Sequence, residues 1–339
     1  MRLSDIVKKQ ERKSRAVEPP KAKAKTEIEK PILKIDDDRA GKTMPAIEKA
    51  SEAVPSGAKG DSVSTYGSCI EDVRSISRNV AGGRHFVIPP SLVNLAGAIK
   101  NYPDEVLLNT VRTTPDTYLY SHSVNVCILA ITIGVDMGYD DTDLELLGTA
   151  AILHDVGMLG IMELTTKQGK LSDAEWKRIR EHPVKGHDAV YRLLDAPSET
   201  KKTISEIILN VHERADGSGY PAGIKNKNMN KHARIIAICD TYEAMTHPRN
   251  HRETRIPHVA IKDIVNISAQ NFDTAVMRHF LNKMSIYPTG SYVKLSNNEV
   301  AKVIRTNNTM PTRPTVQIIL DAAGRKKIKE EIIDLKDVS

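Results

Sequence analysis

Apolar residues recur at three- and four-residue spacing almost throughout the segment from Cys69 to Gln270. This spacing places apolar side chains along one face of an α-helix, whereas the alternating pattern that is typical of half-buried strands is scarce there. We therefore predict an all-α core for this part of the chain. The expected helices cover residues 70–79, 90–100, 103–111, 116–137, 141–155, 172–181, 184–195, 200–213, 230–246 and 256–269.

The segments on either side of this core have a different composition. Residues 1–65 are rich in Lys, Glu, Pro, Ala and Ser and hold few large apolar side chains, which predicts a disordered basic tail. We expect a helical lead-in region over 66–113 and the main helical domain over 114–287. Over 288–339, short apolar runs are separated by Ser-Asn-Asn and Ala-Ala-Gly, which predicts three or four strands in a small antiparallel extension.

Composition and charge argue against several classes of protein. Much of the net charge of +6 comes from the tail, and aromatic residues make up only 4% of the chain, so we expect no binding to a nucleic-acid duplex. The longest apolar run, Val126–Val135, is shorter than the roughly 20 residues that a membrane span needs. Three scattered cysteines without a CxxC pair, and an N-terminus without a secretory signal, predict a cytoplasmic protein with reduced thiols.

The segment from Leu146 to Gly157 ends an expected helix with a histidine followed directly by an aspartate, His154 and Asp155. Successive helical residues point about 100° apart, so an imidazole and a carboxylate can face one cavity, and the aspartate could bridge two cations. Taken alone the pair is weak evidence, because a histidine at a helix C-terminus often only caps the helix.

Further candidate ligands occur in the expected helices or at their ends. They are His122, His182, His212 and Asp240. Asp240 follows the apolar run from Ile235 to Cys239, and a carboxylate there is costly to bury unless it binds a metal or pairs with a residue such as Arg234. Each histidine taken singly is more often a surface or capping residue. Together, imidazoles and carboxylates without a thiolate suit Fe, Mn or Zn in an open hydrolytic site.

The segment from His212 to Pro221, HERADGSGYP, is the second unusual stretch. Its glycines and its proline predict a tight turn directly after a candidate ligand. The turn is either an ordinary connection or the rim of a substrate site, in which case Gly219, Tyr220 and Pro221 would contact the substrate.

These motifs resemble, in the same order, the HD-GYP family of metal-dependent phosphohydrolases, whose characterised members linearise or hydrolyse cyclic di-GMP. The resemblance covers about Thr114 to Tyr287. It rests on HSxxV at His122, HD at His154-Asp155, HPxxG at His182, HExxDGxGYP from His212 to Pro221, and ARIIAICDTYEAM around Asp240.

The resemblance implies an HD-type helical core that binds one or two divalent ions, Fe or Mn, with Zn or Mg as alternatives. It implies that Asp155 bridges two sites and that His154 and Asp155 are catalytic. The first-site ligands would be His122, His154, Asp155 and Asp240, and the second-site ligands His182 and His212. Arg249 and Arg252 match positions that contact substrate phosphate in the family.

Three residues depart from the family pattern. Met158 stands where HDxGK has its lysine, Val211 stands where HHE has its first histidine, and Tyr118 stands where members with a third metal carry a glutamate. The resemblance therefore implies a phosphodiesterase of reduced activity that hydrolyses cyclic di-GMP or a related cyclic dinucleotide by two-metal-type attack of activated water.

Two alternatives stay open beside this enzyme. One is a catalytically impaired receptor that binds the cyclic dinucleotide and signals to a protein partner through the GYP loop or the N-terminal tail. The other, less favoured, is a scaffold without metal. The sequence leaves the oligomeric state open.

Overall fold

The computed structural model describes residues 60–111, 118–165, 167, 169–247, 255, 257–284, 287, 289–307, 310 and 312–338. The tail predicted over 1–65 therefore lies outside the described residues as far as residue 59, and so do Arg249 and Arg252. The first described helix begins at Gly60, inside the range predicted for the tail.

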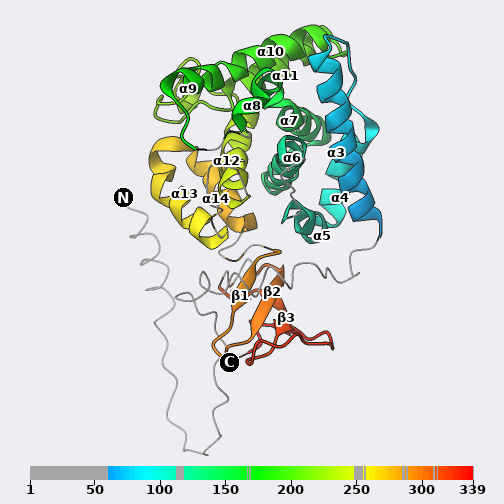
Figure 1. Ribbon diagram of the computed structural model, residues 1–339, viewed down its shortest axis with the longest axis vertical. Coiled ribbons are helices and arrows are strands. Elements are labelled where there is room, and N and C mark those ends of the chain that lie inside the picture. Colours follow the sequence, from blue (N-terminus) through cyan, green and yellow to red (C-terminus); the bar gives the residue numbers. More distant parts are fainter. Residues whose placement is uncertain are drawn as a thin grey trace, which may run out of the picture. The chain divides into compact units, whose positions relative to one another are not determined.

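Helices dominate the described chain, as the sequence predicts (Figure 1). The α-helices are α3 (Gly60–Ala81), α4 (Pro90–Asn101), α5 (Pro103–Leu107), α6 (Tyr118–Asp136), α7 (Asp141–Leu153), α8 (Met162–Thr165), α9 (Asp173–Arg180), α10 (His182–Leu193), α11 (Ser198–Asn210), α12 (Lys231–Thr246), α13 (Pro257–Asn271) and α14 (Thr274–Met284). Short 3-10 helices cover η1 (Leu108–Val111), η3 (Val156–Ile161) and η4 (Asn226–Asn228).

Each expected helix overlaps an observed one, but three boundaries near the candidate ligands differ. Helix α11 ends at Asn210 rather than at residue 213, so His212 lies in the turn that follows it. Helix α7 ends at Leu153, so His154 and Asp155 lie in the turn that follows rather than in the helix. Helix α10 begins at His182. Pro183 fits the first helical turn, because N–H groups in that turn have no hydrogen-bond partner within the helix and proline lacks this group. His154 and His182 therefore lie at helix termini.

Besides the short η4, two helical stretches of the described chain were not predicted. The first is η3 with α8, a tight continuation of the chain directly after the His-Asp pair. The second is α14, which buries Val276, Phe280 and Met284 on one face. Asp273 accepts hydrogen bonds from the N–H groups of Ala275 and Val276 and so caps the start of this helix.

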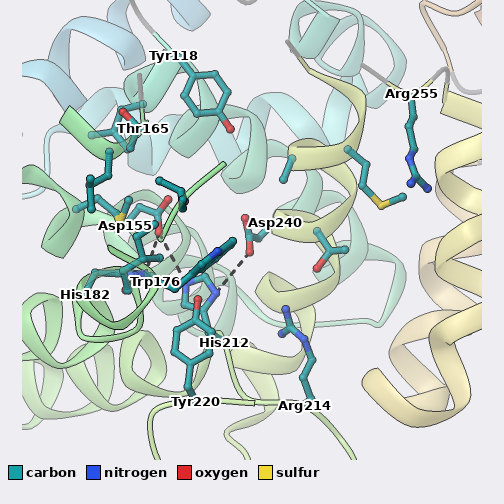
Figure 2. A pocket seen from close by; sticks show the side chains of 18 of the residues that line it. Tyr118, Asp155, Thr165, Trp176, His182, His212, Arg214, Tyr220, Asp240 and Arg255 are labelled. Atoms are coloured by element: carbon teal, nitrogen blue, oxygen red, sulfur yellow. Dashed lines mark hydrogen bonds and ion pairs between the residues drawn. The ribbon is translucent and has the colours of Figure 1, made fainter. Parts of the chain in front are cut away.

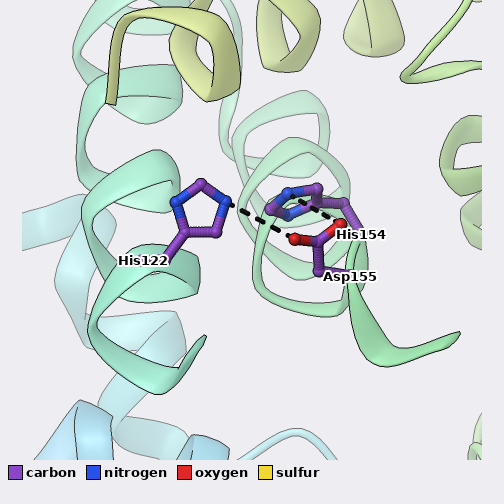
Figure 3. Close-up of side chains that lie close together, drawn as sticks. All are labelled: His122, His154 and Asp155. Atoms are coloured by element: carbon purple, nitrogen blue, oxygen red, sulfur yellow. Dashed lines mark ion pairs between the residues drawn. The ribbon is translucent and has the colours of Figure 1, made fainter. Parts of the chain in front are cut away.

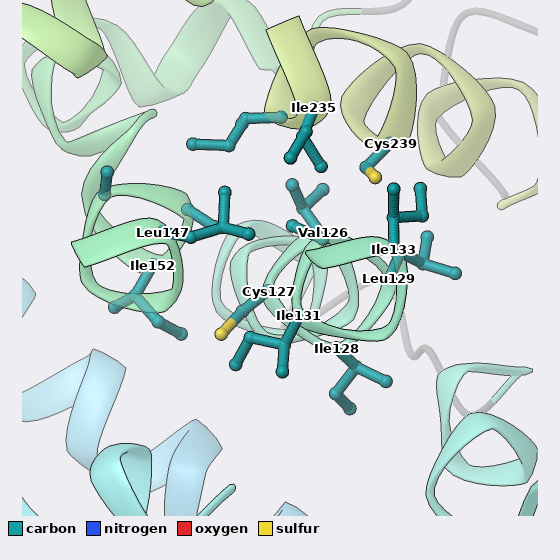
Figure 4. Close-up of a cluster of buried hydrophobic side chains, with 14 of the residues drawn as sticks. Val126, Cys127, Ile128, Leu129, Ile131, Ile133, Leu147, Ile152, Ile235 and Cys239 are labelled. Atoms are coloured by element: carbon teal, nitrogen blue, oxygen red, sulfur yellow. The ribbon is translucent and has the colours of Figure 1, made fainter. Parts of the chain in front are cut away.

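Helix α6 is the centre of the hydrophobic core and packs against α3, α4, α7, α12 and α14. Figure 4 shows its apolar side chains between those of α7 and α12. Gly134 allows α7 to approach closely, since a Cβ atom there would lie 2.8 Å from Cδ2 of Leu147. Side chains of α3 and α4, including Cys69 and Leu95, belong to the same core, so the expected lead-in region shares one apolar interior with the main domain.

Two segments, Tyr118–Asp136 and Asp141–Thr165, are long and apolar enough to cross a membrane by length and composition alone. In this structure 83% and 72% of their most apolar windows are buried. Core helices of a helical protein have this property, so the two segments are weak evidence for a membrane span. The three cysteines are buried free thiols.

The C-terminal part forms the small antiparallel sheet that the sequence predicts. Its strands are β1 (Tyr292–Lys294), β2 (Val300–Arg305), β3 (Thr315–Leu320) and β4 (Ile332–Asp334), in the order β1-β2-β3-β4. Val293 pairs with Ala301, and Val316 pairs with Val303 on one side and Ile333 on the other. These apolar pairs belong to a cluster separate from the helical core.

Candidate metal centre

The six residues predicted as metal ligands converge at one place in the helical core. They come from α6 (His122), the turn after α7 (His154 and Asp155), the start of α10 (His182), the turn after α11 (His212) and α12 (Asp240). Asp155 lies at the centre, because four of the five other residues have a ring nitrogen within 4 Å of its carboxylate. The site is therefore built from segments that are distant in sequence.

A glycine fixes the turn that carries the His-Asp pair. A Cβ atom on Gly157 would lie 2.1 Å from the carbonyl oxygen of His182 and 2.7 Å from the amide nitrogen of Gly186. Only a residue without a side chain can bring η3 this close to the first turn of α10. Gly157 therefore sets the separation between the HD turn and His182.

The first group of ligand atoms consists of His122, His154 and Asp155, whose ligand atoms all lie within 4.8 Å of one another (Figure 3). Nε2 of His122 is 3.6 Å from Oδ2 of Asp155, and Nε2 of His154 is 3.5 Å from Oδ1. Both imidazoles are fully buried. Nδ1 of His154 lies 2.7 Å from the carbonyl oxygen of Ala151 and must donate to it, which leaves the Nε2 lone pair facing Asp155.

Glu243 supports this group from behind and was missed by the sequence analysis. It is fully buried on α12, one turn after Asp240, and its carboxylate accepts a hydrogen bond from Nδ1 of His122. Asn125 donates to the same carboxylate at 3.1 Å, and the Tyr66 hydroxyl donates to Asn125 at 2.8 Å. The signal in the sequence was a second acid three residues after Asp240 in an apolar helix. Helix α3 thus contributes to the support of His122.

The second group consists of Asp155, His182 and His212. Nε2 of His182 is 3.2 Å from Oδ1 of Asp155 and 2.9 Å from Nε2 of His212. Nδ1 of His182 donates to the carbonyl oxygen of Ile179 at 2.6 Å, so its Nε2 is the ring nitrogen that faces the carboxylate. Asp155 is the one residue that both groups contain.

Asp240 lies between the two groups. Its Oδ1 is 3.4 Å from Nε2 of His122, and its Oδ2 is 3.7 Å from Nδ1 of His212. Arg234, the alternative partner considered for Asp240, instead pairs with Asp273 at 3.0 Å. The position of Asp240 is compatible with a ligand of either group.

The protein holds both carboxylates in the ionised form. Burial opposes the charge on Asp155, but His154, together with hydrogen bonds from His182 and His212, holds its pKa well below the usual range. Burial likewise opposes the charge on Asp240, and the nearby imidazoles outweigh it and lower the pKa of that carboxyl. Both oxygens of each carboxylate, that of Asp155 and that of Asp240, are therefore available as acceptors at neutral pH.

The imidazoles differ in their pKa. Burial alone would lower the pKa of His122, but the nearby carboxylates of Glu243 and Asp240 outweigh it and raise the pKa to about 10. Burial and the neighbouring His182 lower the pKa of His212 to about 4. The carboxylates around His122 thus favour a positive charge at this point, which a divalent cation would supply in place of the proton, whereas His182 favours the neutral form of His212.

The residues present fit a divalent cation. Nε2 of His122 and Nε2 of His154 are buried, and among the described residues neither has a hydrogen-bond partner. Buried polar atoms are rarely left unpaired, because each costs about 1–3 kcal/mol. A cation between these atoms and the Asp155 carboxylate would satisfy them. Four imidazoles and two carboxylates without a thiolate suit a borderline to hard divalent metal.

Glu213 shapes the loop that covers the second group. Its buried carboxylate accepts hydrogen bonds from the backbone N–H groups of Ala222, Gly223 and Ile224 at 2.7–3.1 Å. A Cβ atom on Gly219 would lie 2.4 Å from Cα of Glu213, so the loop can fold back on this residue only with glycine there. Glu213 is therefore a loop anchor rather than a candidate ligand.

The aromatic ring of Tyr220 lies against His212 of the metal centre. The peptide bond between Tyr220 and Pro221 is cis. The ring stacks on His212 with centroids 5.1 Å apart and planes 3° apart. Burial raises the pKa of its hydroxyl, so the ring stays neutral. Of the three predicted contact residues in this loop, Tyr220 lines the cavity beside the centre, whereas Gly219 and Pro221 shape the loop itself.

A cavity of about 610 Å³ opens onto the centre (Figure 2). One side is formed by Asp155, His182, His212 and Asp240. Met158, at the position of the expected lysine, is 8% exposed and lies on the cavity wall in an apolar cluster with Leu119, Ile161 and Leu164.

The other departures from the family pattern also have clear surroundings. Val211, at the position of the expected histidine, is fully buried in the main hydrophobic core. Tyr118 stacks on the ring of His122 with centroids 5.6 Å apart and lines the cavity. An aromatic ring and a core valine thus occupy the two positions at which the family pattern described above has a glutamate and a histidine.

Two histidine groups that share one partly buried aspartate define the class of this protein, a helical domain with a candidate metal centre. The chain belongs to the HD domain family, because the model of that family, described as "HD domain", matches residues 105–276. A second model, described as "KOW domain associated with HD domain", matches residues 292–339, the C-terminal sheet. The HD-GYP resemblance drawn from the motifs is confirmed by these matches and by the relatives of the chain.

Curated relatives and a solved structure are similar to this chain. Cyclic di-GMP phosphodiesterase PA4108 of Pseudomonas aeruginosa is 30% identical over 71% of this chain and 57% of its own. The 3'3'-cGAMP-specific phosphodiesterase 3 of Vibrio cholerae is 27% identical over 61% of this chain and 45% of its own. Bd1817, an HD-GYP-type protein from Bdellovibrio bacteriovorus, shares the fold with a TM-score of 0.53 at 19% identity, over 70% of this chain and 76% of its own. The chain spans about half the length of the curated relatives it matches.

Proposed function

We propose that the protein is a metal-dependent phosphodiesterase that hydrolyses cyclic di-GMP or a related cyclic dinucleotide. The observation that carries this proposal is the shared position of Asp155 between two groups of ligand atoms, with two buried Nε2 atoms aimed at it. The curated relatives, which are named as phosphodiesterases of cyclic di-GMP and 3'3'-cGAMP, support the substrate class.

The residues of this chain prepare the site for hydrolysis. Asp155 holds the two halves of the centre together, and Glu243 keeps the ring of His122 in one orientation. Tyr220 and Glu213 order the loop beside His212, where a substrate entering the cavity would lie. A divalent ion bound there would polarise a phosphoryl oxygen and lower the pKa of water, the chemistry that phosphodiester hydrolysis requires.

The proposal extends to the ligand set and the cellular setting. We propose His122, His154, Asp155 and Asp240 as ligands of a first ion and His182, His212 and the shared Asp155 as ligands of a second. Mixed imidazole and carboxylate ligands favour Fe or Mn, with Zn or Mg as less favoured occupants. We further propose a cytoplasmic protein, with a signalling partner that contacts the loop from His212 to Pro221 or the N-terminal tail. Arg249 and Arg252 remain proposed phosphate contacts.

A specific observation favours a second candidate function, a receptor with impaired catalysis. Met158 gives the cavity an apolar wall where the family pattern has a lysine, and Val211 belongs to the core. A missing cation lowers the stabilisation of charge that develops on phosphate in the transition state, whereas binding of the ligand needs it less. A receptor would therefore bind the cyclic dinucleotide with little turnover.

One experiment tests the enzyme and separates it from the receptor. Full-length protein is loaded with Mn or Fe, its metal content is measured, and conversion of cyclic di-GMP to linear dinucleotide or GMP is followed by chromatography. His122→Asn should lose metal and activity, whereas His187→Asn, at a histidine of α10 outside the cavity lining, should keep both.

The outcomes are distinct. Turnover that depends on His122 supports the phosphodiesterase. Folded, metal-loaded protein that binds cyclic di-GMP in calorimetry but yields no product would overturn the enzyme in favour of the receptor. Protein that contains no metal and binds no nucleotide would refute both.

A further inference from the structure

We propose that Trp176 is a stacking platform for one purine base of the cyclic dinucleotide, and this inference rests on the proposed function. Trp176 is the only tryptophan in the sequence. It lies on α9, and its side chain lines the same cavity as His182 and His212 (Figure 2). The structure thus puts a large aromatic surface within the cavity that holds the candidate metal ligands.

Trp176 is not a core residue. It is 48% exposed, and no residue of α9 is buried. An indole whose only role was to stabilise the fold would be expected in the core, since burying an aromatic side chain removes 150–250 Å² from water in a typical protein. An exposed large apolar side chain at the wall of a ligand cavity instead indicates a surface that a ligand covers.

The local structure orders the helix that carries this side chain. Ser172 and Glu175 form a capping box at the start of α9, and Lys167 pairs with Glu175 at 2.6 Å. Ile179 follows Trp176 by three residues on the same face of the helix, and it lines the cavity too. The indole therefore projects from an ordered helix rather than from a mobile loop.

The cavity has two kinds of wall, and the two match the two parts of a cyclic dinucleotide. Carboxylates and imidazoles form the metal-binding wall, while Met158, Leu164 and Ile179, with Trp176, form an apolar wall. A phosphodiester belongs at the first wall and a flat purine at the second. Met158 stands where the family pattern has a lysine, so this part of the wall is apolar rather than cationic.

Intrinsic fluorescence tests the proposal directly, because the emission of the full-length protein comes from one tryptophan. Cyclic di-GMP mixed with the metal-loaded protein should quench this emission in a saturable way before turnover. Loss of base stacking on an aromatic side chain costs about 1–3 kcal/mol per base, so Trp176→Ala should raise KM or Kd by about tenfold. Trp176→Phe should restore most of the affinity, because a phenyl ring also stacks.

Two measurements separate stacking from a merely structural role. The turnover number kcat, the metal content and the melting temperature should stay within about twofold or a few degrees in Trp176→Ala, while KM rises. Tyr191→Ala is the matched control, because Tyr191 is 45% exposed on α10 and is outside the cavity lining. It should leave KM unchanged.

The proposal fails alone if wild-type protein hydrolyses cyclic di-GMP but its fluorescence does not change and Trp176→Ala keeps the wild-type KM. It also fails if Trp176→Phe is as weak as Trp176→Ala in protein that is otherwise intact. Wild-type protein that neither binds nor hydrolyses the nucleotide would instead overturn the proposed function, and the stacking role with it.

Discussion

The two groups of imidazoles that meet at Asp155 are supported in different ways. In the first group, His122 and His154 are fully buried, and the carboxylate of Glu243 holds His122 from behind. In the second group, His182 and His212 contact each other at 2.9 Å and are supported by a helix terminus and a loop. The first group therefore depends on the core of the protein, and the second on the contact between η3, α10 and the loop after α11.

This difference sets an expected order of metal affinity. The first group has rings fixed by hydrogen bonds inside the core and has Asp240 beside it, so it should bind its ion more tightly. The second group lacks the extra imidazole that the position of Val211 would supply, and that position is filled by core packing. We expect the second ion to be lost first on dialysis against a chelator.

The largest expected effect follows from replacing the residue that the two groups share. Asp155→Asn removes the bridging charge, so both ions should be lost and hydrolysis should fall by about 10²–10³-fold or more. Metal analysis and turnover of cyclic di-GMP measure the two losses. Asp188→Asn is the control, because its carboxylate is exposed on α10 and pairs with His187, which lies outside the cavity lining. If Asp155→Asn kept one tightly bound ion, the shared role of Asp155 would be wrong.

The next effect should be confined to the first group. Glu243→Gln keeps a hydrogen-bond acceptor for His122 but removes the negative charge behind it. Changes behind a metal ligand typically cost about 10–100-fold in metal affinity, so the first ion should bind that much more weakly while the second changes little. Competition with a chelating dye measures both affinities. Glu206→Gln, on the exposed side of α11, should have no effect.

A third change should act mainly on the second group. In Gly157→Ala the new methyl group would lie 2.1 Å from the carbonyl oxygen of His182, so η3 and α10 must separate. We expect a loss of about 1–3 kcal/mol in the free energy of unfolding and weaker binding of the second ion. Gly160→Ala is the matched control, since a Cβ atom there meets open space. Equal melting temperatures in the two variants would contradict the tight contact.

Much of this site could be predicted from the sequence because its ligands occur in recognisable local patterns. His154 and Asp155 follow an apolar helix, and Asp240 follows an apolar run. Each could therefore be recognised as a polar residue at a position where burial costs free energy unless the residue has a partner. The helical core and the small sheet were likewise predicted from their periodicity. The structure adds where these residues meet.

The contacts between distant segments could not be predicted in the same way. Glu243 supports His122 across the core, and Gly157 contacts the carbonyl group of His182, but neither pairing leaves a mark on local periodicity. The loop after His212 was predicted as a turn, yet the role of Glu213 depends on three backbone N–H groups that only the folded loop presents. Contacts between distant segments decide these roles, and such contacts cannot be predicted from a local sequence pattern.

The smallest expected effect is a gain, and it concerns the wall beside the first group. Met158→Lys places an ammonium group on the cavity wall close to the phosphate of a bound ligand. The surrounding apolar cluster is only slightly exposed, so part of the electrostatic gain is offset by the cost of burying the charge, and we expect about a tenfold rise in kcat. Met162→Lys is the control, because Met162 is 38% exposed and outside the cavity lining. A rise in KM without a gain in kcat, at intact metal content, would show that the apolar wall is itself needed for binding, which would strengthen the stacking role of Trp176 and argue against a missing cation as a limit on activity.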